Sequence, residues 1–276
     1  MTGPAIDADA FNAFEAAAWE QRATGYDRFF GAITSRLAGP LLDAAAVGDA
    51  TRVLDVATGP GYVARAAADR GAAVIGVDVA EAMVALARRL HPDLDVRLGD
   101  AHALPFPDGS FDAVVANFLL LHSGAPERAV AEFSRVLAPG GRVAVTVWDV
   151  PERAAMFGIA LAAVGDAGAA PPGDLPVGPD FFRFSVDEEF DALLAGAGLT
   201  DRAVETIAFT HRIASADELW EGFVDGTART AALILGQSEE MQRAIRAAFD
   251  ARLEAFRDGD GFALPVSVKL ASARRP

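Results

Sequence analysis

Two glycines and one aspartate stand where a parallel α/β sheet binds its ligands. Gly59 and Gly61 follow the apolar segment 52–57, and Asp78 follows the apolar segment 73–77. Glycine lets the backbone pass close to a ligand, and the helix expected after Gly61 favours negative groups at its N-terminus. Asp78 would lie beside this loop and could accept hydrogen bonds from two ribose hydroxyls. These residues alone fit a nicotinamide dinucleotide or S-adenosylmethionine, and a ligand-free turn with Asp78 as a helix N-cap is the structural alternative.

A histidine is the candidate proton acceptor. His122 comes five residues after Asn117, which ends another apolar segment, 111–116, so it is expected at the same carboxyl edge of the sheet. An imidazole there could take a proton near neutral pH; the alternative is that His122 caps the next helix or packs against the ligand. None of the four histidines has a metal-ligand spacing with another histidine or a carboxylate cluster, so no metal site is expected.

The first half of the chain alternates between apolar runs and helical patterns. The strands expected from these runs are 52–57, 73–77, 95–98, 111–116 and 142–147. Helices are expected between them, for example 126–137, which stops at the Pro-Gly-Gly of 139–141. This alternation is typical of an open parallel sheet covered by helices.

Helical patterns also come before this half. From Phe11 to Leu37, large apolar residues recur at spacings near three, four and seven, as in an amphipathic helix. Gly25 is expected to divide this segment into two helices, and Gly39-Pro40 to separate it from a further short helix.

The second half follows a different pattern. Residues 168–179 are rich in Pro, Gly and Ala and predict a long loop. The elements expected after it are helix 186–197, strand 203–211, mostly helix over 216–256, and a last strand 265–270.

Composition narrows the class of protein. With 276 residues, 52% hydrophobic and 23% charged, the chain has the composition of a folded α/β protein and not of a disordered one. The absence of cysteine excludes a thiolate nucleophile and Cys-ligated zinc. A net charge of −15 disfavours a nucleic-acid partner. Residues 1–10 lack the features of a secretory signal, and the longest apolar stretch, 154–164, is too short for a bilayer, so a cytoplasmic protein without a membrane span is expected.

Four stretches within residues 50–150 decide between the two cofactors. They are VLDVATGPG at 53–61, VIGVD at 74–78, GDAHALPFPDGSFD at 99–112 and LAPGGRV at 137–143. In this order and spacing the sequence resembles the class I S-adenosylmethionine-dependent methyltransferases, specifically the type 11 group related to the ubiquinone and menaquinone biosynthesis methyltransferases. A nicotinamide-binding protein would share the first two stretches and leave the third unexplained.

The resemblance implies roles for individual residues. Asp55 and the glycine loop would shape the pocket for the methionine part, Asp78 would hold the ribose, and Asp100 and Ala101 would meet the adenine. Tyr26 would donate a hydrogen bond to the methionine carboxylate. The cofactor-binding residues expected in full are Tyr26, Asp55, Ala57, Thr58, Gly59, Gly61, Asp78, Val79, Met83, Asp100, Ala101, His102, Asn117, Phe118 and His122. Ala57 stands where the family often has glycine, a difference that would narrow the pocket.

The resemblance also implies the complete fold. It is an α/β fold with a seven-strand, mainly parallel Rossmann-like sheet, flanking helices and an antiparallel last strand. An N-terminal helical lid is expected over 1–48 and the cofactor-binding half over 49–150. The acceptor-side half, 151–276, would complete the sheet and carry a helical insertion at about 215–258.

The expected activity is in-line methyl transfer from S-adenosyl-L-methionine to a small-molecule acceptor, with S-adenosyl-L-homocysteine as product and His122 as general base. The alternatives are a protein that binds S-adenosylmethionine without transferring its methyl group and an NAD-dependent dehydrogenase. Aromatic residues after the fifth strand could wall an acceptor pocket, which would favour an apolar or aromatic acceptor, or they could equally be ordinary core packing. These residues are Trp148, Phe157, Phe181, Phe182 and Phe184. The pattern predicts neither the acceptor atom nor an oligomeric state.

Overall fold

Parallel strands form the centre of the structure, a computed structural model that describes residues 6–276. The sheet has the order β3-β2-β1-β4-β5-β8-β6, and the short strand β7 pairs with β8. The strands are β1 (Arg52–Val56), β2 (Ala73–Asp78), β3 (Asp95–Leu98), β4 (Phe111–Asn117), β5 (Leu137–Trp148), β6 (Thr200–Ile213), β7 (Arg257–Asp258) and β8 (Gly261–Arg274). Strands β1 to β5 pair in parallel, and β8 is antiparallel to β5, β6 and β7. The predicted α/β class with a mainly parallel sheet and an antiparallel last strand is confirmed; β7 is an additional strand that the sequence did not reveal.

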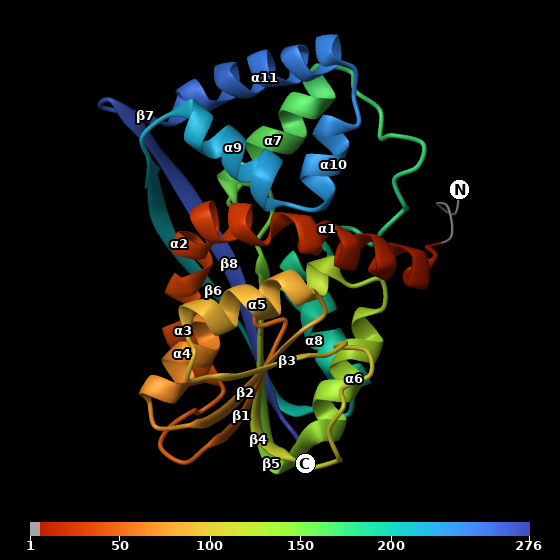
Figure 1. The fold of residues 1–276 in the computed structure, drawn as a ribbon, viewed down its shortest axis with the longest axis vertical. Helices are drawn as coiled ribbons and strands as arrows, with labels where there is room; N and C mark the ends of the chain where they lie inside the picture. Colours follow the sequence, from red (N-terminus) through yellow and green to blue (C-terminus); the bar gives the residue numbers. More distant parts are fainter. Residues whose placement is uncertain (1–5) are drawn as a thin grey trace.

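Helices cover both faces of the sheet because successive strand residues point to opposite sides. On β1 and β4, Val53, Ala113 and Val115 pack under one helical layer, whereas Leu54 and Val114 pack under the other. The first layer contains α3 (Ala38–Ala44), α4 (Tyr62–Asp69) and α5 (Glu81–Leu90), and the second contains α6 (Pro126–Val136) and α8 (Asp187–Gly196) (Figure 1).

A third group of helices lies beyond the carboxyl ends of the parallel strands. Helix α1 (Ala8–Phe29) crosses over this edge and packs against α5 and α9. Above it lie α7 (Ala155–Asp166), α9 (Ala216–Gly226), α10 (Arg229–Leu235) and α11 (Glu239–Leu253), with β6 and β8 extending up beside them (Figure 1). We call α7, α9, α10 and α11 the cap.

Gly25 does not divide the N-terminal helix, as the sequence analysis expected. Helix α1 continues through it to Phe29, and a new short helix, α2 (Gly31–Thr34), starts after Phe30. A Cβ atom placed on Gly25 would lie 2.2 Å from the backbone oxygen of Asp225 in α9. Glycine is therefore needed here because two helix backbones touch.

The other differences concern where elements begin and end. Gly39-Pro40 lies in the first turn of α3, where proline is tolerated because the missing N–H would have no partner in the helix. Strands β6 and β8 are longer than expected because they pair with each other from Ile213–Phe262 to Thr200–Arg274. The segment between Asp166 and the 3₁₀ helix Arg183–Ser185 contains no helix or strand, as predicted.

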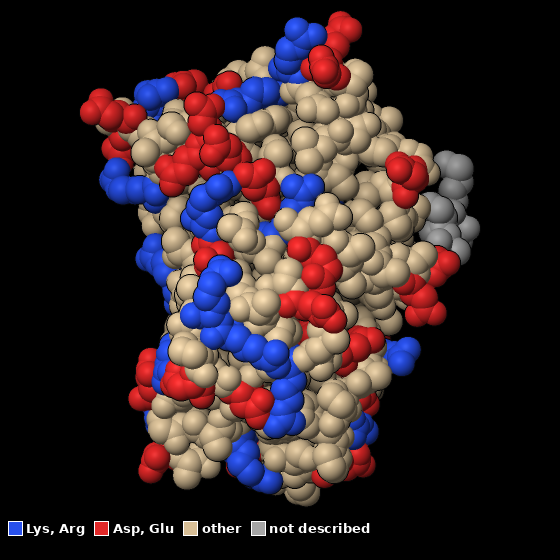
Figure 2. All heavy atoms as spheres, viewed as in Figure 1, with Lys and Arg blue, Asp and Glu red and all other residues tan. Residues whose placement is uncertain are grey.

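Acidic and basic side chains are interspersed over the face seen in Figure 2. Many form ion pairs at the surface, such as Arg65 with Asp69 and Asp93. Exposed pairs of this kind contribute little to stability. Among residues 6–276, no helix is both long enough and apolar enough to cross a bilayer.

Candidate functional site

A cavity of about 320 Å³ lies where the parallel strands end. Residues that follow β1, β2, β3 and β4 form its floor, α1 closes it on one side, and the connection between α9 and α10 closes it on another. This is the edge at which open α/β sheets bind ligands.

Most of the residues selected from the sequence line this cavity. Those that do are Tyr26, Ala57, Gly59, Asp78, Val79, Met83, Asp100, Ala101, His102, Asn117, Phe118 and His122. Asp55, Thr58 and Gly61 do not appear on its wall. The sequence therefore brings twelve residues from separate segments to one place, with three more behind them.

Asp55 acts from behind the loop that it was expected to shape. Its Oδ2 atom accepts hydrogen bonds from Thr58 Oγ1 at 2.6 Å and from the backbone N–H of Ala64 at 3.0 Å, which ties β1 to the first turn of α4. Burial raises the pKa of Asp55 to about 7. Gly61 caps α4 with φ of 84°, and a Cβ there would meet the His91 ring at 3.1 Å.

Asp78 holds the loop between β1 and α4 directly. Its Oδ2 atom accepts from the N–H of Gly59 at 2.9 Å, and its Oδ1 atom accepts from the N–H of Ala80 at 3.0 Å. Ala80, rather than Asp78, is the N-cap of α5. Burial raises the pKa of Asp78 to about 6. The loop itself has left-handed backbone at Ala57, with φ of 55°, and at Gly59, with φ of 52°.

A chain of hydrogen bonds orders the loop after β3. Asp100 Oδ1 accepts from the backbone N–H of His102 at 2.8 Å and lies 2.7 Å from His102 Nδ1. His102 Nε2 lies 2.7 Å from Ser123 Oγ, which in turn accepts from the N–H of Ala125. This network places the ring proton of neutral His102 on Nδ1. About half of the Asp100 side chain stays exposed at the cavity.

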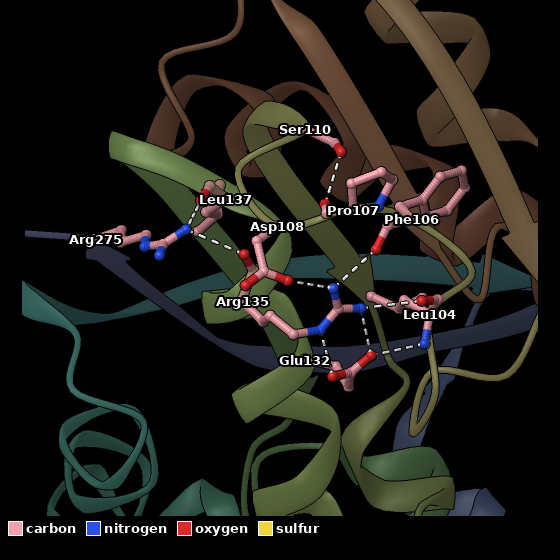
Figure 3. A network of polar contacts seen from close by, with 9 residues as sticks. All are labelled: Leu104, Phe106, Pro107, Asp108, Ser110, Glu132, Arg135, Leu137 and Arg275. Carbon is pink, nitrogen blue, oxygen red and sulfur yellow. Dashed lines mark hydrogen bonds and ion pairs between the residues drawn. The ribbon is translucent and has the colours of Figure 1, made fainter.

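The same loop is fixed farther along by Arg135 of α6 (Figure 3). Its guanidinium pairs with Glu132 at 2.7 Å and Asp108 at 2.8 Å, and donates to the carbonyl oxygens of Phe106 and Leu104. Glu132 also accepts from the N–H of Leu104 at 2.8 Å. An arginine whose donors are used in this way holds loop 104–108 against α6.

Polar groups are paired at the other end of the cavity. The Tyr26 hydroxyl donates to Thr34 Oγ1 at 3.1 Å, and burial raises the pKa of this phenol to about 12. Asn117 donates from Nδ2 to the carbonyl of Thr34 at 3.1 Å and accepts from Thr146 Oγ1 at 2.6 Å. Tyr26 therefore stays protonated, with its hydrogen directed to Thr34.

His122 pairs with a carboxylate that the sequence analysis did not single out. Its Nδ1 atom lies 3.0 Å from Glu15 Oε2, and its ring meets Trp19 edge-to-face at 5.0 Å. Glu15 is only 3% exposed, and its Oε1 atom has no hydrogen-bond partner among the described residues. The signal in the sequence is position: Glu15 follows Phe11 by four residues on the buried stripe of α1.

Aromatic side chains form much of the remaining wall. Trp148, Phe157 and Phe181 line the cavity as predicted, whereas Phe182 and Phe184 do not. Tyr26 and Phe118 belong to the same wall, as do Trp19 and Phe30, which the sequence analysis did not single out.

Phe118 has a positive φ of 60°, which is rare for a bulky residue, and stacks on Trp148 at 4.1 Å between ring centroids. Strained backbone of this kind is concentrated at functional sites.

Arg229 was also missed, because it lies beyond the recognised stretches. It follows the loop between α9 and α10 and reaches the cavity beside Thr227 and Thr230. Among residues 6–276, no group of three or more acidic or histidine side chains has an arrangement that could hold a metal ion.

Comparison with known proteins assigns residues 54–145 to the methyltransferase domain family. Demethylmenaquinone methyltransferase of Renibacterium salmoninarum is 41% identical over 111 residues, which cover 40% of this chain and 47% of the relative. The same enzyme of Thermus thermophilus is 46% identical over 114 residues, which cover 39% and 51%. The chain thus spans about half the length of the curated relatives that it matches.

Solved structures share the fold over a greater length. A putative methyltransferase from Bacillus halodurans has a TM-score of 0.56 and 23% identity, covering 87% of this chain and 98% of its own. A phosphoethanolamine N-methyltransferase of Haemonchus contortus, in complex with S-adenosyl-L-methionine, has a TM-score of 0.59 and 19% identity, covering 96% and 60%. At these identities the likeness concerns the fold alone.

Proposed function

We propose that this chain, which carries a class I methyltransferase domain of the type 11 group, transfers a methyl group from S-adenosyl-L-methionine to a small-molecule acceptor. The observation that carries the proposal is the cavity, because the ends of the matched stretches meet there. Asp78, the Gly59 loop and the Asp100–Ala101 pair line one part of it, and aromatic residues line the rest.

The residues of the first part fit the cofactor. Asp78 would accept hydrogen bonds from the ribose hydroxyls, since its carboxylate is already held at the cavity wall by two backbone N–H groups. Asp100 keeps an exposed carboxylate oxygen for the adenine amine, and the backbone N–H of Ala101 would face the ring. When bound, S-adenosyl-L-methionine supplies an electrophilic methyl group on a sulfonium.

His122 would act as the general base for a hydroxyl acceptor. Its Nδ1 proton is directed to Glu15, which leaves the lone pair of Nε2 for the acceptor proton. The acceptor oxygen would then use its electron pair to bond to the methyl carbon while the carbon–sulfur bond breaks toward sulfur. Helix α1 and the connection between α9 and α10, which line the cavity, would limit the access of water to this step.

Titration calorimetry with S-adenosyl-L-homocysteine, and in parallel with NAD, tests the cofactor assignment. We expect micromolar binding of the first alone. Binding of NAD alone would support a dehydrogenase instead, and binding of neither would contradict the proposal.

A second experiment separates transfer from binding. Product S-adenosyl-L-homocysteine is measured by mass spectrometry during incubation with S-adenosyl-L-methionine and a panel of phenols, aromatic acids and quinols. We expect His122→Ala to lower turnover about 10²- to 10⁴-fold with cofactor affinity unchanged. His211→Ala, a histidine outside the cavity, is the matched control. Tight cofactor binding without product across the panel would favour a protein that binds the cofactor without transfer.

A further inference from the structure

Arg229 carries a positive charge at the cavity wall, and most hydrogen-bond donors of its guanidinium have no partner among the described residues. Its Nη1 atom donates to the carbonyl oxygen of Pro179 at 3.0 Å, and its guanidinium lies 5.3 Å from the ring centroid of Phe11. No other hydrogen bond joins the guanidinium to the described residues, and no carboxylate among them lies within ion-pair distance. Burial lowers the pKa of Arg229 because it removes water from around the charge.

Arg135 is a structural arginine of the same chain whose guanidinium donors are paired within the protein. Its guanidinium pairs with Glu132 of the same helix and with Asp108, and it donates to the carbonyl oxygens of Phe106 and Leu104 (Figure 3). Arg229 has five N–H donors and uses one of them. A partly buried arginine with free donors at a cavity wall is suited to bind an anion from the ligand.

The nearest acidic side chains do not take this role. Glu15 and Asp180 oppose the effect of burial on Arg229 from a distance. Glu15 Oε2, however, lies 3.0 Å from His122 Nδ1, its Oε1 atom has no hydrogen-bond partner among the described residues, and Asp180 Oδ1 accepts from the N–H of Phe182 at 2.9 Å. The guanidinium of Arg229 therefore lies in the field of these two carboxylates but forms an ion pair with neither.

The position of Arg229 separates it from the methionine end of the cofactor site. It lies against Phe11 near the start of α1, whereas Tyr26 lies near the other end of this helix and donates to Thr34 of α2. Phe11 and Tyr26 are fifteen positions apart on α1, a rise of about 22 Å along the helix. An anion bound by the guanidinium of Arg229 at the Phe11 end would therefore fit the acceptor better than the amino-acid part of the cofactor.

We propose that the acceptor is an aromatic acid, with a ring that packs among Phe157, Phe181 and Trp19 and a carboxylate that binds Arg229. This inference rests on the proposed function and specifies its acceptor. The aromatic wall supplies flat apolar surface, and the carboxylate matches the paired N–H donors of the guanidinium. The hydroxyl to be methylated would face His122 on the same wall.

A matched pair of probes tests the charge requirement. 3-Hydroxy-2-naphthoate and its neutral amide have the same rings and hydroxyl and differ in the anionic group. Each is titrated calorimetrically into the protein with and without saturating S-adenosyl-L-homocysteine. The variants are Arg229→Gln, Arg229→Lys and, as a control on an exposed arginine of α11, Arg243→Gln.

The wild-type protein and Arg243→Gln should bind the acid about 10- to 100-fold more tightly than the amide, as expected for charge-assisted bonds. Arg229→Gln should abolish this preference, and Arg229→Lys should keep part of it. Equal binding of both probes to the wild type, or binding of neither, would overturn the inference, as would a preference that survives in a folded Arg229→Gln. If S-adenosyl-L-homocysteine binds and the preference is absent, only the acceptor class fails; if it does not bind, the proposed function fails independently.

Discussion

The affinity for S-adenosyl-L-homocysteine should depend on the protonation of Asp78. Its carboxylate must accept from the ribose hydroxyls while it also holds Gly59 and Ala80, and burial raises its pKa to about 6. The ionised form is the better acceptor. We therefore expect the binding constant to be constant above about pH 7 and to fall as the pH drops through 6.

The size of the effect follows from the pKa. At pH 5 a carboxyl with a pKa of about 6 is about one-tenth ionised, so affinity should be about tenfold lower than at pH 8, or about 1.4 kcal/mol. Asp78→Asn removes the charge and keeps one acceptor oxygen. Its affinity at pH 8 should be about 5- to 30-fold below wild type, with no change down to pH 5.

Protonation of Asp78 stabilises the folded state of the free protein, although it weakens ligand binding. Because the folded-state pKa of Asp78 lies above its ordinary value of 3.8, the folded state binds its proton more tightly than the unfolded state. The corresponding stability is fully present below about pH 4 and is lost as the pH rises through 6. Between pH 8 and 5, protonation of Asp78 therefore does not unfold the protein. Unfolding caused by this group cannot account for the expected loss of affinity.

Calorimetric titrations at pH 5, 6, 7 and 8 on the wild type, Asp78→Asn and Asp55→Asn make the comparison. Asp55 has a raised pKa of about 7 but does not line the cavity, so its variant should keep the wild-type drop near pH 6. A wild-type affinity that is flat between pH 5 and 8, or an Asp78→Asn profile that follows the wild type, would refute the assignment of Asp78.

Two further predictions concern backbone positions and are checked by thermal unfolding. Gly25→Ala should destabilise the protein by about 1–3 kcal/mol, because the new Cβ would collide with the backbone of Asp225. The control, Gly165→Ala in the open part of α7, should stabilise the protein by up to about 1 kcal/mol. Equal effects of the two substitutions would refute the close contact at Gly25. Ala57→Gly should raise the free energy of unfolding by about 0.5–1 kcal/mol, because glycine adopts a left-handed φ without strain. The control, Ala244→Gly on the surface of α11, should lower it by about 1 kcal/mol. A lower stability of Ala57→Gly would contradict the backbone strain at Ala57.

The cofactor part of the cavity was predictable because its residues follow strands. The apolar run that precedes Gly59 and the one that ends at Asp78 can be recognised in the sequence. Parallel pairing of the two strands brings their carboxyl ends together. Asp55 shows the limit of this reasoning. A carboxylate in a strand can point to the cavity or behind it, and only its bonds to Thr58 and Ala64 show which.

The acceptor part was less predictable because it is assembled from distant segments. Glu15 and His122 are 107 positions apart, and no local pattern relates them. Arg229 follows a short loop after α9, and α9 packs on α1, which is about 200 positions earlier in the sequence. Gly25 was misread for the same reason, since a glycine that breaks a helix and one that admits another backbone are identical in sequence.

The contact between α1 and α9 also joins two walls of the cavity. Arg22 donates to the carbonyl of Val224, Arg28 pairs with Asp225, and Gly25 allows the backbones to touch between these two bonds. These three contacts lie within two helical turns and join α1 to α9. Because α1 and the end of α9 both line the cavity, a substitution that displaces α1 should change the acceptor side and the cofactor side of the cavity together.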